Sequence, residues 1–199
     1  LHEVWKIFET EVRYSVYESG FQPHAALLMP NHGHMSLSTP ELDISQTMQG
    51  LLSRFTRRIN EAAGHTGRVM GARYHGTLIT NPDYWANVIR YIYQNPVRAR
   101  LCTTVLEWPY STLPELVGEL PSSIPIYPFK DDIFELTSGE ALVDQMEWLN
   151  KTPSPEEIEE LTRALRRREL KRLVHPETRR EIALESPLDF YREILLQSA

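Results

Sequence analysis

The chain has 199 residues, of which 41% are hydrophobic and 24% charged, a composition typical of globular proteins rather than disordered or fibrous ones. The single cysteine, Cys102, excludes an internal disulfide bond and favours a reducing compartment, so we expect the protein to be cytoplasmic. No apolar run approaches the length of a membrane span, so we expect no membrane partner.

The net charge of −6 argues mildly against a nucleic-acid partner, but the charges are unevenly distributed. Residues 54–100 form an arginine-rich block, residues 107–160 an acidic block, and residues 163–180 a second basic block. Charge runs of this kind are usually solvated helix faces. The alternative is that the first block marks the footprint of a polyanion.

The first half of the chain alternates helical and extended patterns. Apolar residues recur at helical spacing over 1–19 and 44–62, and Gly20 and Gly64 are typical of helix ends. Strands are predicted over 21–29, 33–39 and 73–80, with a short turn joining the first two and a glycine-rich loop at 65–72. A helix is predicted over 83–95, because its apolar residues share one face and Pro96 should end it.

The second half begins with a proline-rich stretch. Five prolines within 109–128 predict an extended linker. Helices are predicted beyond it at 139–149, at 155–173 after the cap Ser154, and at 187–196. We therefore expect one domain over 1–118, and a linker with a helical extension over 119–199.

Two short motifs carry residues suited to chemistry. His32 and His34 are two residues apart beside a predicted strand, where side chains at this spacing point to one face and could bind a divalent metal ion. Taken alone, such a pair is more often solvated or hydrogen-bonded than metal-bound. In the helix predicted over 83–95, Tyr91 and Asn95 are one turn apart on a face different from the apolar one.

In combination, these motifs resemble a known family, the single-tyrosine HUH transposases of the IS200/IS605 type, and most closely the REP-associated tyrosine transposases. The resemblance covers roughly residues 1–118. Its residues are Leu28-Met29-Pro30-Asn31-His32-Gly33-His34, Gly71-Ala72-Arg73-Tyr74, Arg90-Tyr91-Ile92-Tyr93-Gln94-Asn95-Pro96-Val97-Arg98-Ala99 and Trp108-Pro109-Tyr110-Ser111.

The resemblance implies an α+β fold, a ferredoxin-like antiparallel sheet with helices on one face. The helical C-terminal extension is predicted from the capping patterns beyond residue 118. It implies that His32, His34 and Asn95 bind Mg²⁺ or Mn²⁺ and that Tyr91 is the nucleophile that cuts single-stranded DNA through a 5′-phosphotyrosine. The substrate would be hairpin DNA, and the protein a monomer or homodimer. The residues expected to contact the DNA backbone are Arg54, Arg57, Arg58, Arg73, Arg90 and Arg98.

The sequence departs from the family pattern in two places. Gly33 stands where the family usually has a bulky apolar residue, so we expect a hole on the opposite face of the strand. The first strand of a ferredoxin-like unit would have to precede Leu1, and without it a sheet edge would be exposed unless another segment covers that edge.

Three alternatives remain open at this point. The chain could be a nucleic-acid-binding module of the same fold that has lost catalysis. It could be a metallo-hydrolase that uses a metal-bound water, with Tyr91 in a structural role. It could also be a replication initiator of the HUH superfamily, although the run Asn95-Pro96-Val97-Arg98 favours the transposase branch.

Overall fold

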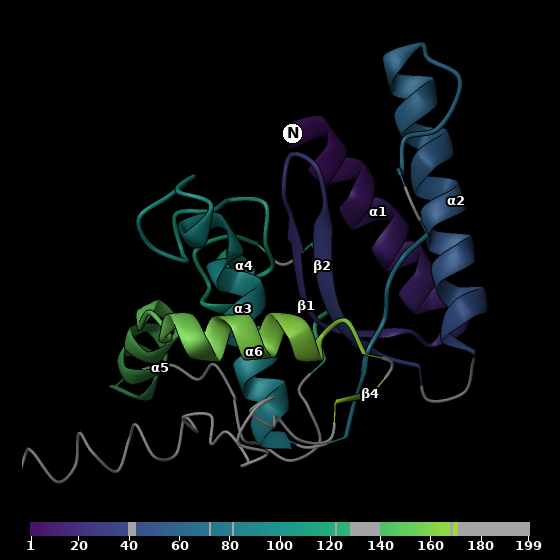
Figure 1. Cartoon of the computed structure of the whole chain (residues 1–199). Helices are drawn as coiled ribbons and strands as arrows, with labels where there is room; N and C mark the ends of the chain where they lie inside the picture. The colour runs from purple at the N-terminus through teal and green to yellow at the C-terminus, as the bar shows by residue number, and fades with distance from the viewer. Residues whose placement is uncertain are drawn as a thin grey trace, which may run out of the picture. The chain divides into compact units, whose positions relative to one another are not determined.

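The structure is a computed structural model that describes residues 1–39, 43–71, 73–80, 82–121, 123–127, 140–167 and 169–170 (Figure 1). The chain forms two compact units, one of Leu1–Tyr74 with Pro109–Tyr127, the other of His75–Trp108 with Pro128–Ala199. The helix predicted over 187–196, and most of the second basic block, lie outside the described residues. None of the described helices is both long enough and apolar enough to cross a bilayer.

The first unit contains the elements predicted with the fewest errors. They are α1 (His2–Ser19), β1 (Gln22–Leu28), β2 (Gly33–Ser38) and α2 (Ile44–Ala63). The unit also contains the short helix α4 (Leu113–Leu116), which lies within the stretch predicted as an extended linker. Gly20 and Gly64 end α1 and α2 in the left-handed region, at φ 61° and 59°, where a glycine is not strained. Asp43 caps α2 by accepting a hydrogen bond from the Ser45 amide.

The core of this unit lies between the two long helices and the hairpin. The apolar stripe of α1 meets that of α2, and the rings of Phe8 and Phe55 contact edge-to-face at 5.7 Å. In Figure 1, α1 and α2 run side by side next to the hairpin. The buried core residues are Trp5, Phe8, Val12, Phe21, Ala26, Leu28, Leu51, Phe55 and Ile124.

The hairpin pairs β1 with β2 in antiparallel register, with Leu27 opposite His34 and Leu28 opposite Gly33. The other edge of β1 is covered by residues 110–112. The Leu28 amide donates to the Tyr110 carbonyl, and the Thr112 amide donates to the Ala26 carbonyl, both at 2.9 Å. The stretch predicted as an extended linker therefore packs on the sheet, because β1 offers unpaired backbone groups that must be satisfied.

The second unit is mostly helical. It contains β3 (Leu78–Ile79), α3 (Pro82–Arg98), α5 (Glu140–Asn150), α6 (Pro155–Ala164) and β4 (Glu169–Leu170), which pairs with β3 in parallel. The strand predicted over 73–80 is reduced to two residues. The apolar face predicted for α3 is confirmed, since Trp85, Val88, Ile89 and Ile92 are all buried.

The prediction that Pro96 ends α3 was wrong, because the helix continues to Arg98. A proline cannot donate to the carbonyl four residues before it, which here is that of Ile92. The Asn95 side-chain amide lies 3.3 Å from this carbonyl oxygen and 2.7 Å from that of Tyr91, and donates to both. A side-chain donor thus replaces the missing backbone donor. The chain leaves the helix after Arg98, and Arg100 takes the left-handed conformation with φ 57° that is common just after a helix end.

The helix predicted over 155–173 ends at Ala164, nine residues early. Its start is confirmed, including the capping box between Ser154 and Glu157. The Thr77 hydroxyl lies 2.7 Å from the carbonyl oxygens of Leu165 and Arg167. These contacts and the β3–β4 pairing hold the chain after Ala164 in a non-helical path. The fold class is α+β as predicted, whereas the ferredoxin-like arrangement and the domain boundary at 118 stay predictions.

Candidate functional site

The two histidines of the first motif lie against each other at the turn of the hairpin. His32 is exposed in the turn that precedes β2, and His34 is half-buried at the second position of that strand. The turn is closed by the Met29 amide, which donates to the His32 carbonyl at 2.7 Å. The imidazole rings meet edge-to-face, with centroids 4.9 Å apart and planes at 89°. The hairpin therefore brings two imidazoles together as the spacing predicts.

Asn31 orients the His32 ring. Its side-chain oxygen Oδ1 lies 2.7 Å from His32 Nδ1, and since an amide oxygen only accepts, this contact favours the tautomer that carries the proton on Nδ1. The other nitrogen, Nε2, then holds the lone pair that a metal ion needs. Asn31 was not predicted as a site residue, and its position next to His32 in the sequence was the only signal that could have indicated it.

The hole expected beside Gly33 is not present. A Cβ atom placed on Gly33 would lie 3.2 Å from the Leu27 carbonyl oxygen and 3.2 Å from Leu28 Cδ1. The side chain of Leu28, the β1 partner of Gly33, already occupies this space. Glycine therefore fits between the two histidines because β1 approaches closely. A larger residue would have to displace either the backbone of β1 at Leu27 or the side chain of Leu28.

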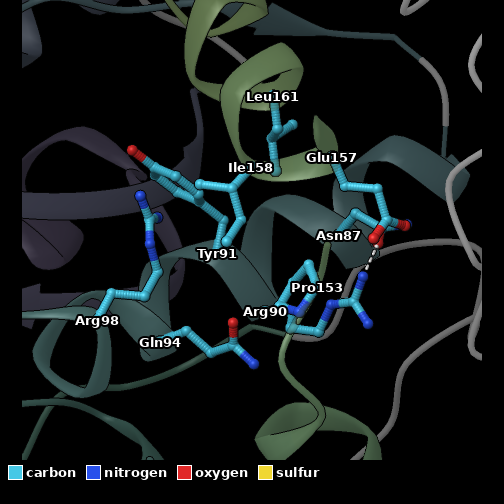
Figure 2. Close-up of a pocket in the computed structure, with 9 residues that line it drawn as sticks. All are labelled: Asn87, Arg90, Tyr91, Gln94, Arg98, Pro153, Glu157, Ile158 and Leu161. Carbon is cyan, nitrogen blue, oxygen red and sulfur yellow. Dashed lines mark hydrogen bonds between the residues drawn. The ribbon is translucent and has the colours of Figure 1, made fainter. Parts of the chain in front are cut away.

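Tyr91 lies in the second unit, on α3, and is half-buried. Its ring carries the Arg98 guanidinium on one face, with Cζ 4.8 Å from the ring centroid. Figure 2 shows this stacking, with Ile158 of α6 beside the ring and the tyrosine hydroxyl pointing away from Arg90 and Gln94. Residues of α3 and α6 together line the narrow pocket around Tyr91.

Asn95 lies one turn after Tyr91, and its side chain is fixed by the two carbonyl contacts described above. Since Nδ2 donates to the backbone of α3, Oδ1 is the atom that a metal ion could bind. The same side chain therefore combines a structural role with the geometry of a possible ligand.

Two further residues of the motif belong to the interior. Tyr93 is 1% exposed and is therefore a core residue. Because it is two residues from Tyr91 on α3, its side chain points to a different face of the helix. Arg90 is 2% exposed, donates to Asn87 Oδ1 at 2.8 Å, and lies with Cζ 4.7 Å from the centroid of the Trp148 ring. Arg90 thus differs from the other arginines considered for DNA contact.

Those other arginines are at least partly exposed, and most have partners. Arg54 and Arg58 both pair with the buried Glu11, and the more exposed Arg57 pairs loosely with Glu61. Arg73 is exposed, with Cζ 5.7 Å from the ring centroid of Tyr74. Arg98 is exposed beside Tyr91.

His32 and His34 belong to the first unit, and Tyr91 and Asn95 to the second, so each pair is defined by itself. Within the described ranges, no three His, Cys, Asp or Glu side chains cluster as a metal site. The predicted ligand set would not form such a cluster, because its third member is an asparagine. That the two histidines lie close to Tyr91 and Asn95 stays a prediction.

The chain is thus an α+β protein. It has a pair of histidines at a hairpin turn, and it has a tyrosine and an asparagine one turn apart on a helix. The sequence is similar to a curated protein of Haemophilus influenzae named "Putative REP-associated tyrosine transposase", with 28% identity over 46% of this chain. This similarity confirms the resemblance to REP-associated tyrosine transposases that the motifs indicate.

The chain spans 58% of the length of that relative. A solved structure, of a REP-associated tyrosine transposase bound to a REP hairpin, aligns with 63% of this chain and 77% of its own, at 20% identity and a TM-score of 0.48. No family model matches the sequence.

Proposed function

We propose that the chain is a metal-dependent endonuclease and strand transferase that acts on single-stranded DNA, with hairpin DNA as its substrate. The observation that carries the proposal is the imidazole pair, in which Asn31 holds His32 Nδ1 as a donor and leaves Nε2 for a metal ion. The sequence similarity to a transposase supports the same assignment.

The proposed metal ligands are His32, His34 and Asn95. Two imidazole nitrogens and an amide oxygen form a mixed nitrogen and oxygen set, which suits Mn²⁺ well and Mg²⁺ acceptably. Such an ion, when bound, would neutralise charge on a phosphate oxygen. Two contacts support this role, since His32 and Asn95 are each held by a hydrogen bond that would leave a ligand atom available.

Tyr91 is the proposed nucleophile. Its Oη would attack the phosphorus atom, forming the Tyr–O–P bond while the bond from phosphorus to the 3′ oxygen breaks. The phenolic proton leaves to solvent, and the 3′ oxygen is released as a hydroxyl group. The 5′-phosphotyrosine retains the energy of the phosphodiester, so attack by a 3′-hydroxyl can rejoin the ends without ATP.

The residues proposed to contact the DNA backbone are Arg54, Arg57, Arg58, Arg73 and Arg98. Arginine forms two parallel hydrogen bonds to phosphate, and each contact contributes affinity that salt weakens. Arg90 is not included, because its guanidinium is buried against Trp148. We further propose a ferredoxin-like arrangement for residues 1–118, with β1 and β2 as two of its strands, followed by an extension over 119–199.

The proposal is tested by incubating the protein with hairpin-bearing single-stranded DNA, labelled at the 5′ or the 3′ end, in Mn²⁺ or EDTA. We expect cleavage and a denaturation-resistant protein–DNA adduct in Mn²⁺ only, with the adduct retaining the 3′ label. Cleavage without any adduct would contradict the proposal and favour a metallo-hydrolase. Hairpin binding without cleavage would favour the inactive module.

A further inference from the structure

A hollow of about 210 Å³ lies between α1 and α2, outside the histidine and tyrosine motifs. One wall is formed by Thr10, Glu11 and Tyr14 of α1. Tyr17 does not line the hollow, but it follows Tyr14 by three residues and so lies on the same face of this helix. The facing wall is the arginine cluster of α2, and the two helices run antiparallel here, since Glu11 pairs with Arg58 and Tyr14 meets Arg54. The residues that line the hollow are Thr10, Glu11, Tyr14, Arg54, Arg57 and Arg58.

Glu11 fixes the two inner arginines. Its carboxylate is buried, accepts a hydrogen bond from Arg54 Nε at 2.9 Å, and forms an ion pair with Arg58, whose Nε lies 3.0 Å from Glu11 Oε1. Arg54 also donates through Nη2 to the Ser15 hydroxyl at 2.6 Å. Holding a guanidinium in place before binding reduces the entropy that a ligand must overcome. The lining has three positive groups against one negative, so the hollow remains positively charged.

Tyr14 lies beside these charges, and Tyr17 continues the same exposed face of α1 one turn further on. The Tyr14 ring is 4.6 Å from Arg54 Cζ and is 47% exposed, whereas Tyr17 is 87% exposed. Tyr17 is therefore not explained by packing in the core, and it lies one turn beyond Tyr14 on the same face of α1. A positive groove combined with aromatic faces is the arrangement that binds unpaired nucleic acid, because phosphates meet the cations and bases stack on the rings.

We propose that this hollow binds an unpaired segment of the DNA strand, with Arg54, Arg57 and Arg58 on its phosphates and Tyr14 and Tyr17 stacked on its bases. The inference rests on the DNA substrate of the proposed function but does not depend on the nuclease chemistry. A duplex is a poorer ligand for this surface, because its bases already stack on each other and offer no face to the tyrosines.

The test is fluorescence anisotropy with a labelled oligothymidylate of about 10 nucleotides, a length suited to a groove of this kind. The measurements are made without metal, so that binding is separated from cleavage. Tyr17→Ala should weaken binding roughly fivefold or more, as loss of a stacked base does, whereas Tyr17→Phe retains the ring and should bind like the wild type.

Arg57→Gln tests the phosphate contact, and Arg68→Gln is its matched control on an exposed loop of the same unit. Arg57→Gln should reduce the slope of log affinity against log salt by about 0.7, the value for one phosphate on a single strand. Arg68→Gln should leave the slope unchanged. Circular dichroism would confirm that these exposed substitutions leave the helices intact.

Three results would overturn the inference. They are unchanged binding by Tyr17→Ala, equal losses from Arg57→Gln and Arg68→Gln, and duplex binding as tight as that of the single strand. Failure of the proposed function has a different signature, because oligothymidylate would then bind in the predicted pattern while hairpin DNA gives no adduct. Conversely, an adduct that forms normally with Tyr17→Ala, together with unchanged binding, would refute only the site between α1 and α2.

Discussion

The extension of α3 past Pro96 depends on one side chain, and this dependence can be measured. Asn95→Ala removes the side-chain donor to the Ile92 carbonyl, which Pro96 deprives of the usual backbone donor four residues on. Leaving such a group unsatisfied costs about 1–3 kcal/mol, and the Ile92 residue is buried. In a Pro96→Ala background the alanine supplies its own N–H, so the same Asn95→Ala change should cost about 1 kcal/mol less.

The assay is urea unfolding of the four chains of this double-mutant cycle, followed by tryptophan fluorescence and analysed by linear extrapolation. Asn95→Asp is an additional control of the same shape. It replaces the donor Nδ2 with an oxygen that faces two carbonyls, so it should be at least as destabilising as alanine. An Asn95→Ala cost that is the same with proline and with alanine at position 96 would refute this explanation of the helix.

Three further changes follow from the packing of the first unit. Gly33→Val should lower the free energy of unfolding by about 1–3 kcal/mol, measured by urea denaturation, because the added atoms meet Leu28 and the backbone of β1; equal stability would mean that the strand moves freely. Glu11→Gln should destabilise by about 1–3 kcal/mol, since it leaves Arg54 without its buried partner, whereas exposed Glu18→Gln should not. Burial lowers the pKa of His24 below its usual 6.5, and the hydrogen bond to the Tyr127 carbonyl offsets part of this shift. The unfolded chain therefore binds more protons than the folded one, so the free energy of unfolding should fall as pH drops below 6.5. His24→Gln should flatten this pH dependence, and an unchanged slope would contradict the explanation.

Much of the first unit could be predicted from the sequence, because its signals are local. Helical periodicity gave α1 and α2, and the left-handed glycines after each helix gave their ends. The hairpin followed from two short apolar segments around a Pro-Asn turn. The contact of His32 with His34 was predictable for the same reason, since the two residues are only two positions apart, at the junction of the turn with β2.

The errors arose where distant residues decide the structure. The prolines of 109–128 indicated a linker, but the open edge of β1 binds residues 110–112, which are more than 80 positions away. The Thr77 hydroxyl contacts the carbonyl oxygens of Leu165 and Arg167, just after the residue at which α6 ends. The sequence around α6 does not indicate this distant contact. The burial of Arg90 depends on Trp148 in another helix, and no pattern around residue 90 contains that information.

The most direct test of the central claim is to identify the residue that becomes attached to DNA. The protein is incubated with hairpin-bearing single-stranded DNA and Mn²⁺, digested with trypsin and nuclease, and the modified peptide is sequenced by mass spectrometry. We expect the nucleotide on Tyr91, loss of the adduct in Tyr91→Phe, and retention of the adduct in Tyr93→Phe, whose ring is buried in the core. An adduct on another residue, or one that persists in Tyr91→Phe, would contradict the account.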